Sequence, residues 1–296
     1  MKLNFKKIGI EDKSLFEKIL SDVSSNSFSK SFGSYFLWAE SFKIKMCFDN
    51  GILYVKYHNE NPTYEMPKGS KTDENLKKAI NSLLENHKNT EKSKEFKFIG
   101  LTKQEAEKLK KLFPDKFEIT PERNDFEYIY SAKALAELKG KKYHSKRGHI
   151  AKFSKINNWK YEPLNMDKKQ DYIEFFKLWF KEKQGANPNE MKAIEKSLNY
   201  YNELELYGGA IYVDEKIAAC AIGEKINSET FVVHFEKALG EFADAYTVIN
   251  NELCKHIQSK YKYINREEDL GISGLRKAKL SYHPICFIEK YSAVAK

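Results

Sequence analysis

The order of strand and helix patterns in this chain predicts an α/β (α+β) protein with two domains, each holding a mixed sheet flanked by helices. At 296 residues the chain is long enough for two domains and a sizeable hydrophobic core. From Trp159 onward the patterns follow the order strand, two helices, three strands, helix, strand, helix and strand. The first half repeats part of this order, which indicates a tandem of related domains.

Composition and charge narrow the class of protein. Hydrophobic residues make up 41% of the chain and aromatic residues 14%, as expected for a globular protein and not for a disordered one. The 51 Lys and Arg residues outnumber the 42 Asp and Glu residues, which gives a formal charge of +9. This balance favours an anionic partner such as tRNA, a phosphorylated cofactor or an acidic lipid surface, without choosing among them.

The cysteines and the apolar runs bear on the compartment. Cys47, Cys220, Cys254 and Cys286 have neither metal-ligand nor disulfide-framework spacing, so we expect no metal site and buried thiols in a reducing compartment. The chain start lacks an apolar signal region, and the longest apolar run, 217–222, is too short to span a membrane. We expect a cytoplasmic protein, and peripheral contact with the inner membrane face stays open.

Patterns in the first half alternate between helix and strand. Period-two runs on either side of residues 49–51 predict a β-hairpin. Asp73 is expected to cap one helix, and Thr102 with Glu105 forms the capping box of another. The aromatic cluster at 32–38 is expected in the core. The expected helices are 14–20, 73–84 and 102–112, and the expected strands are 42–48, 52–57, 96–99, 117–119 and 126–130.

A basic segment separates the two halves. Between Leu138 and Tyr161 there are eight Lys or Arg residues and no acid. As a helix, this segment would carry Lys142, Lys146, His149 and Lys152 on one face, with Arg147 beside them. One-sided charge of this kind is typical of a surface that binds phosphate or carboxylate. The alternative is a solvated helix that joins two domains.

The second half begins with a strand at 159–164. Asp167 is expected to cap a long helix with an aromatic face, and residues 185–189 end it. A second helix at 188–201 precedes three strands in a meander. Those strands are expected at 207–213, 217–223 and 230–235, and a helix follows at 243–259.

The most informative stretch runs from residue 263 to residue 284. It begins as a strand, continues as a charged turn at 265–271, and forms a helix from about Ile272 that Pro284 ends. A strand-like tail follows at 285–291. A charged turn between a buried strand and a helix is where α/β proteins place their chemistry. The alternative is a solvated surface turn with a helix cap.

Two motifs support a family resemblance. The element order from Trp159 looks like the GNAT acyltransferase fold. The basic motif Lys139–Ile150 and the two parts of the C-terminal motif, Ile264–Gly271 and Gly274–Pro284, resemble the C-terminal domain family of phosphatidylglycerol lysyltransferases. The resemblance covers most of the chain.

The resemblance implies tandem GNAT-like domains, the first one degenerate. It places the first domain at 1–140, a basic connecting helix at 141–158 and the second domain at 159–296. Membrane enzymes of this family resemble Fem-type transferases, which use aminoacyl-tRNA as donor, and their acceptor is an anionic lipid. Since this chain has no membrane half, the lipid acceptor stays open.

Aminoacyl transfer needs an oriented nucleophile, a group that takes its proton and a stabilised oxyanion. His234 and Glu236 share one face of the third meander strand, so either is a candidate base, although a hydrogen-bonded structural His234 is the stronger alternative. The resemblance makes Tyr282 a candidate general acid, whereas composition alone would place it in the core.

The charged turn and the helix after it supply candidate binding groups. Arg276, Lys277 and Lys279 are expected to hold a phosphate or carbonyl oxygen, because they follow the turn directly. Asp269 is expected to brace the turn, through Arg266 or through backbone N–H groups. The remaining candidate for substrate binding in this turn is Asn265.

One departure from the GNAT pattern concerns CoA. Many GNAT enzymes hold the CoA pyrophosphate on glycine-rich backbone at the start of the helix that follows the third meander strand. Here only Gly240 remains, Phe242 would block close approach, and Glu241 and Asp244 already supply negative charge. The sequence therefore disfavours acetyl-CoA without excluding it.

Three functions stay open at this point. The first is an acyltransferase that moves an aminoacyl group from aminoacyl-tRNA to an amine or hydroxyl acceptor, such as a phosphatidylglycerol-like lipid or a small molecule. The second is a CoA-dependent N-acyltransferase with an altered loop. The third is a binding module on a GNAT scaffold without catalysis, because a fold alone does not establish an activity.

Overall fold

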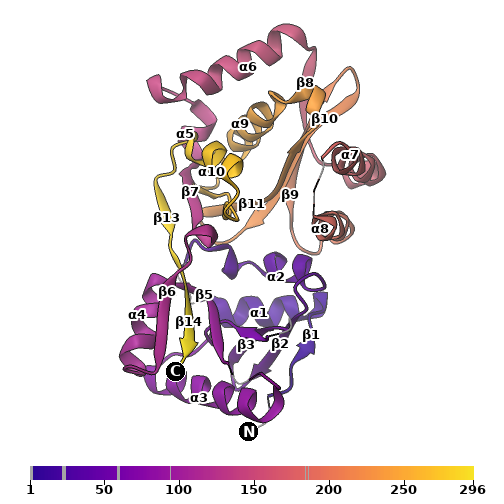
Figure 1. The fold of residues 1–296 in the computed structure, drawn as a ribbon. Helices are drawn as coiled ribbons and strands as arrows, with labels where there is room; N and C mark the ends of the chain where they lie inside the picture. The colour runs from indigo at the N-terminus through magenta and orange to yellow at the C-terminus, as the bar shows by residue number, and fades with distance from the viewer. Residues whose placement is uncertain (1–2, 22–24, 59–60, 94, 184, 186) are drawn as a thin grey trace.

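The computed structural model describes residues 3–21, 25–58, 61–93, 95–183, 185 and 187–296. These residues form two seven-stranded sheets, and each sheet lies in a lobe of its own (Figure 1). We call them the first and the second lobe. None of the helices in the described ranges is both long and apolar enough to cross a bilayer.

The first lobe is built on the sheet β1-β2-β3-β4-β5-β14-β6. Its strands are β1 (Lys6–Lys7), β2 (Ile44–Asp49), β3 (Ile52–Tyr57), β4 (Thr63–Tyr64), β5 (Lys97–Thr102), β6 (Phe117–Pro121) and β14 (Lys290–Ala295). Its helices are α1 (Lys13–Leu20), α2 (Phe32–Trp38), α3 (Asp73–Thr90) and α4 (Lys103–Leu112). The predicted hairpin is present as β2–β3.

The second lobe is built on the sheet β13-β7-β12-β11-β10-β9-β8. Its strands are β7 (Glu127–Ser131), β8 (Trp159–Pro163), β9 (Tyr207–Val213), β10 (Lys216–Lys225), β11 (Thr230–Ala238), β12 (Tyr263–Asn265) and β13 (Cys286–Ile288). Its helices are α5 (Ala132–Glu137), α6 (His144–Ile156), α7 (Lys169–Glu182), α8 (Pro188–Asn199), α9 (Ala245–Ile257) and α10 (Ser273–Leu280). The predicted meander is β9–β10–β11.

Each lobe receives one strand from the other half of the chain. Strand β7 comes from the first half but pairs with β12 and β13 in the second sheet. Strand β14 ends the chain and pairs with β5 and β6 in the first sheet (Figure 1). The division expected at 141–158 therefore does not separate the two sheets. Strand partners are chosen by long-range pairing, which the pattern of a single strand does not reveal.

A buried ion pair lies where the two exchanged strands meet. Glu127 on β7 and Lys290 on β14 are 2.7 Å apart, and their side chains are 0% and 4% exposed. Ser27 donates to Glu127 Oε1 at 2.5 Å, and Lys290 donates to Ser27 Oγ at 2.8 Å. These contacts satisfy both charges inside the protein, which a buried ion pair requires.

The two lobes also share a hydrophobic core. One cluster of buried side chains contains Phe16 and Phe36 of the first lobe together with Phe176, Ile222 and Phe235 of the second. Helices α2 and α8 pack against each other across the boundary. The lobes are therefore joined by apolar packing as well as by strand exchange.

Local predictions differ from the structure at a few positions. Thr102 and Glu105 form the predicted capping box, but Thr72 and not Asp73 caps α3. Cys286 is exposed and not buried as expected, because β13 lies at the edge of its sheet. The single tail strand expected at 285–291 is divided into β13 and β14, which join different sheets.

Candidate functional site at the opening between β11 and β12

The second sheet opens where two parallel strands part. Strands β11 and β12 pair only between Thr230–Val232 and Tyr263–Asn265. Strand β11 continues to Ala238, whereas β12 ends at Asn265. Side chains of the next residues, Arg266 and Glu267, reach back to β11 across the gap. The structure thus brings together the charged turn and the third meander strand, as the sequence led us to expect.

A β-bulge directs His234 into this region. The pairing of β10 with β11 shifts between Ile222 and Gly223, which leaves His234 as the extra residue on β11. Bulges of this kind re-aim side chains next to functional sites. Gly223 permits the close approach, because a Cβ atom there would lie 2.0 Å from the carbonyl oxygen of Val232.

Two carboxylates hold the His234 ring. Its Nδ1 lies 2.8 Å from Glu267 Oε1, and its Nε2 lies 2.8 Å from Glu224 Oε1. Burial opposes charge on the ring, but hydrogen bonds to Glu224 and Glu267 raise the pKa of His234 to about 10. The imidazolium donates through both nitrogens and has no lone pair for another proton. This geometry makes His234 a fixed cation and argues against its use as a base.

The Glu236 carboxylate also has hydrogen-bond partners within the protein. Its carboxylate accepts from Arg266 Nη2 at 2.6 Å and from Asn250 Nδ2 at 3.0 Å. The Glu236 and Arg266 side chains are 10% and 13% exposed. Among the described residues, Arg266 Nη1 and Asn250 Oδ1 are buried without a hydrogen-bond partner. The Glu236 carboxylate is therefore flanked by one buried donor, Arg266 Nη1, and one buried acceptor, Asn250 Oδ1, that have no partner among the described residues.

Tyr282 lies beside this pair. The Arg266 guanidinium lies 4.6 Å from its ring centroid, and Lys146 Nζ lies 3.7 Å from the same centroid. The Tyr282 hydroxyl contacts Thr247 Oγ1 at 3.4 Å. Burial raises the pKa of the Tyr282 hydroxyl, so it stays protonated. Burial and the Arg266 charge lower the pKa of Lys146 to about 8, which leaves part of its amine neutral near pH 7.

Asp269 braces the turn through a backbone N–H group, one of the two expected means, and through Arg276 in place of Arg266. Its carboxylate is fully buried and forms a two-pronged pair with Arg276, with both N···O distances at 2.8 Å. Tyr128 donates to it at 2.5 Å and the Gly271 N–H at 2.9 Å. Although burial opposes the charge, these bonds hold the pKa of Asp269 well below its usual range. Arg266, the other expected partner, instead pairs with Glu236.

Lys279 and Asn265 fix the backbone of the turn. The Lys279 ammonium donates to the carbonyl oxygens of Arg266 and Glu268. Asn265 Oδ1 accepts from the Glu267 N–H at 2.8 Å. Arg276 and Lys279 therefore point at groups of the protein itself. The sequence had suggested that these two cations share one anion site, and the structure does not direct them at such a site.

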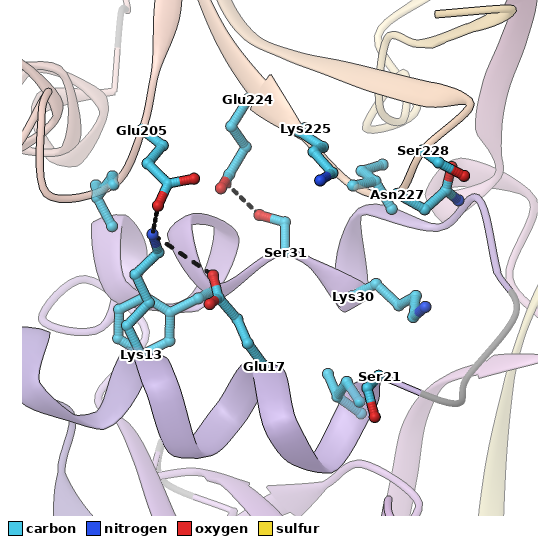
Figure 2. Close-up of a pocket in the computed structure, with 14 residues that line it drawn as sticks. Lys13, Glu17, Ser21, Lys30, Ser31, Glu205, Glu224, Lys225, Asn227 and Ser228 are labelled. Atoms are coloured by element: carbon cyan, nitrogen blue, oxygen red, sulfur yellow. Dashed lines mark hydrogen bonds and ion pairs between the residues drawn. The ribbon is translucent and has the colours of Figure 1, made fainter.

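The bulged strand pair also borders a cleft between the lobes. The cleft has a volume of about 460 Å³ and is lined by α1, the segment 30–32 and the end of the β10–β11 hairpin (Figure 2). Figure 2 shows Glu224 of the second lobe and Ser31 of the first lobe joined by a hydrogen bond across it. Lys30 lines the cleft and forms no ion pair with any described residue, and burial lowers its pKa. Gly33 leaves room for Glu224, because a Cβ atom there would lie 2.1 Å from Glu224 Oε1.

The basic run divides into three kinds of residue. Arg147 donates to the carbonyl oxygens of Leu138 and Gly140, so it holds the connection between α5 and α6. His149, together with Lys152, pairs with Asp244. Lys142 precedes α6 and is exposed, so it is not part of the helical face expected for it. On α10, Lys277 is likewise exposed.

A comparison with protein families gave a match over nearly the whole chain. The model described as phosphatidylglycerol lysyltransferase, C-terminal, matches residues 21–294. The chain belongs to this family. A comparison with functionally curated proteins found no match.

Several solved structures share the fold of this lysyltransferase-family chain. A conserved protein of unknown function from Bacteroides thetaiotaomicron VPI-5482 is 34% identical, with a TM-score of 0.92, and the match covers 99% of this chain and 100% of that one. L-PGS from Bacillus licheniformis is 14% identical, with a TM-score of 0.66 over 96% of this chain and 92% of that one. FemX is 11% identical, with a TM-score of 0.60 over 98% and 97%.

The GNAT fold is shown by the same comparison. A tandem GNAT protein from the clavulanic acid biosynthesis pathway is 8% identical, with a TM-score of 0.51 over 100% of this chain and 99% of that one. The chain is thus a tandem GNAT-like protein with two mixed sheets flanked by helices. L-PGS and FemX share this fold with the chain.

In this member of the family, the loop expected to hold CoA pyrophosphate is engaged by an acid of the protein. The Gly240 N–H donates to Glu182 Oε2 at 2.9 Å. Asp244, next to α9, forms an ion pair with Lys152 and a hydrogen bond with His149, so its expected repulsion of phosphate is reduced. Glu182, which sequence reasoning did not single out, adds a further acid at this loop.

Sequence reasoning also missed several other residues at the opening. Glu224 is the one acid in the long apolar pattern of β10, and an acid in a strand buried on both faces is a signal that could have been used. Glu267 stood inside the charged turn without being singled out. Asn250 looks like an ordinary position of α9, and only its contact with Glu236 shows its place.

Proposed function

We propose that this protein is an aminoacyltransferase that moves an aminoacyl group from aminoacyl-tRNA to an amine or hydroxyl acceptor. The acceptor class includes a phosphatidylglycerol-like lipid headgroup and small molecules. The donor is an activated ester, so the protein must orient the acceptor, take up its proton and stabilise the oxyanion. The proposal extends to a cytoplasmic location, with peripheral contact to the inner membrane face.

The observation that carries the proposal is the set of unused polar groups at the opening of the second sheet. Arg266 Nη1 is a buried donor without a partner among the described residues, and it belongs to a guanidinium beside the Tyr282 ring. These two residues suit the ester carbonyl, whose oxygen gains negative charge during attack. Asn250 Oδ1 suits the amino group of the aminoacyl ester, since a neutral amide oxygen accepts from an ammonium.

The proton acceptor in this proposal is Lys146. Its pKa of about 8 leaves a neutral fraction at pH 7, and its Nζ lies over the Tyr282 ring. The acceptor oxygen or nitrogen attacks the ester carbon while Lys146 takes its proton. The bond to the tRNA 3′ oxygen then breaks, and that oxygen receives a proton from Lys146 or Tyr282. His234 and Glu236 act as positioning residues, because their polar atoms already bind other groups.

The donor assignment rests on the loop before α9. Glu182 already accepts from the Gly240 N–H, so a pyrophosphate would have to displace a carboxylate there. A CoA-dependent acyltransferase would need that loop free. We therefore favour aminoacyl-tRNA over CoA.

The test is transfer of a radiolabelled amino acid from a set of aminoacyl-tRNAs to phosphatidylglycerol vesicles and to small amines. Lys146→Met should reduce transfer by about 10²-fold or more, because acid–base catalysis typically contributes that factor. Lys152→Met is the matched control, since Lys152 lies on the same helix but pairs with Asp244. Transfer from acetyl-CoA with none from aminoacyl-tRNA would reject the proposal in favour of the CoA-dependent alternative.

A further inference from the structure

A partly buried cation on the wall of the cleft in Figure 2 has no partner. Lys30 lines this cleft, whose volume is about 460 Å³, and also a second cleft between the lobes, of about 700 Å³. None of the described residues forms an ion pair or a hydrogen bond with its ammonium group. Burial lowers the pKa of Lys30, and no acid lies close enough to raise it. A cation that loses water in this way is normally paired, so the site lacks an anion.

The acids that line the first cleft are already bound to other groups. Glu17 and Glu205 lie 3.5 Å and 3.0 Å from the ammonium of Lys13. Glu224 contacts the ring of His234 at 2.8 Å. Figure 2 shows Lys13 with its two acids at one end of the cleft and the unpaired ammonium at the other. The protein itself therefore does not supply the missing anion.

The second lobe adds a further cation and a hydroxyl group to this end of the cleft. Lys225 and Ser228 belong to the β10–β11 hairpin, line the cleft and are exposed. Their side chains form no hydrogen bond or ion pair with any residue that the structure describes. Figure 2 shows them on the wall opposite Lys30. An anion in the cleft would thus meet unused donors from both lobes.

The lining residues favour phosphate over carboxylate and over an acyl chain. In the described part of the chain no Arg lines either cleft, and Arg is the side chain whose planar group fits a carboxylate with two parallel hydrogen bonds. Lysine acts as a point charge, which suits the greater charge of a phosphate. An acyl chain would find little apolar surface, because the large apolar side chains of the wall are buried. They are Leu20 (3% exposed), Phe32 (2%) and Leu204 (2%).

We propose that this cleft binds a small, water-soluble molecule through its phosphate group, with Lys30 as the main cation and Lys225 and Ser228 on the opposite wall. The volume of about 460 Å³ lies in the range of small-molecule sites. The site is separate from the proposed transfer site at the opening between β11 and β12. The proposal therefore does not depend on aminoacyl transfer.

One chain of contacts connects this cleft to the opening of the second sheet. Ser31 and Glu224 line the cleft and are joined by a hydrogen bond between the lobes (Figure 2). The same Glu224 carboxylate holds Nε2 of His234, whose Nδ1 contacts Glu267. A phosphate in the cleft would therefore lie beside the carboxylate that positions the His234 ring, and its charge would be felt there.

The experiment is calorimetric titration of the full chain with inorganic phosphate, and with succinate as a dicarboxylate comparator at the same ionic strength. Wild type should bind phosphate saturably and more tightly than succinate. Lys30→Gln should weaken phosphate binding by about tenfold or more, because it removes a charged hydrogen-bond donor. Lys18→Gln is the matched control, since Lys18 is exposed on α1 and lines neither cleft. The control should bind as wild type does.

Two further measurements locate the phosphate. Lys225→Gln should weaken binding about threefold, because an exposed cation contributes less, and this variant keeps the test valid if Lys30→Gln does not fold. In nuclear magnetic resonance spectra, phosphate should shift the imidazole N–H signals of His234 in wild type and not in Lys30→Gln.

Three results would overturn the proposal. They are a lack of saturable phosphate binding by wild type, equal phosphate binding by wild type and Lys30→Gln, and succinate binding as tight as phosphate binding. Phosphate binding that leaves the His234 signals unchanged would place the anion outside this cleft and would also reject the proposal.

Discussion

His234 owes its charge to two carboxylates on either side of its ring. Glu224 comes from the neighbouring strand β10 and Glu267 from the turn after β12, so one imidazolium connects three segments. Glu224 in turn accepts from Ser31 of the first lobe. Removing the ring would leave two acids facing each other in a buried space, and such a loss is costly. The residue therefore organises the site without being free to exchange a proton.

The first prediction concerns the pH dependence of this contact. His234→Gln should lower the free energy of unfolding by about 3–5 kcal/mol near pH 6, because it breaks a buried charge pair. Since the pKa of His234 is raised to about 10 in the folded protein, its stabilisation is complete below its unfolded pKa and is lost as the pH rises toward 10. The difference between wild type and variant should thus shrink by about 1.4 kcal/mol per pH unit between pH 7 and pH 9.

Urea denaturation at several pH values measures this difference. Groups that titrate in both proteins cancel in the comparison, so the variant is its own control for other residues. A difference that does not change with pH would show that His234 is neutral in the folded protein. The fixed-cation role would then be wrong.

The second prediction separates two neighbouring cations of α10. Arg276→Ala should destabilise the protein by about 2–4 kcal/mol, because it leaves the fully buried Asp269 with Arg123 as its remaining cation. Lys277→Ala, one residue away and exposed, should change stability by less than about 0.5 kcal/mol. Chemical denaturation of both variants checks this. An Arg276→Ala variant that keeps full stability but loses activity would return Arg276 to the catalytic role considered from the sequence.

At the scale of elements, α6 and the turn before it carry the basic run, but only part of this run is free for a partner. Lys152 forms an ion pair with Asp244, His149 forms a hydrogen bond with the same carboxylate, and Arg147 binds carbonyl oxygens of the chain. Exposed lysines, including Lys142, remain on the surface. Some residues of the run join elements of the protein, as the connecting-helix interpretation expects. Others are exposed, so they are accessible to the anionic partner that the binding-surface interpretation expects.

The third prediction tests the exposed part of this element as a tRNA surface. Binding of tRNA should weaken steeply with salt. Replacing Lys141, Lys142 and Lys155 with Ala should reduce the slope of log K against log salt by about 0.7–0.9 for each tRNA phosphate that the variant no longer neutralises. Filter binding at several salt concentrations measures the slope. Lys177→Ala on α7 is the control, because Lys177 is 58% exposed and lies on another helix. An unchanged slope in the triple variant would show that these three lysines do not bind tRNA phosphates. The connecting-helix interpretation of the basic run would then hold.

At the scale of the whole molecule, strand exchange and a shared core make the two lobes depend on each other. Strand β7 completes the second sheet and β14 the first, and Glu127 and Lys290 pair between them. Two domains linked only by a flexible connection would unfold independently. These lobes should not, because unfolding one sheet removes a strand from the other.

The fourth prediction follows from this dependence. Lys290→Met should lower the free energy of unfolding by about 3–5 kcal/mol, because it leaves Glu127 buried without its cation. Unfolding of wild type and variant should remain a single transition, which far-ultraviolet circular dichroism and tryptophan fluorescence should report at the same urea concentration. Trp38 of the first lobe and Trp179 of the second make fluorescence sensitive to both. Two separate transitions would show that the lobes are independent.

Features that depend on a few neighbouring residues could be predicted from the sequence alone. Alternating and helical periodicity gave the meander, the β2–β3 hairpin and the capping box at Thr102, because each depends on neighbours within a few residues. The family could also be inferred from the sequence, because the motif at 264–284 is contiguous. The same locality explains why the charged turn could be expected to meet β11, which the order of elements places beside it.

Which groups pair inside the protein could be seen only in the folded chain. The sequence offered Arg266 as a partner of Asp269 and offered Arg276 and Lys279 as substrate-binding groups, and folding directed each to a different acceptor inside the protein. Nothing in the pattern of β7 or β14 stated that each would cross to the other sheet. Pairing of charges and strands depends on distances between segments that lie far apart in the chain, and these distances exist only once the core has formed.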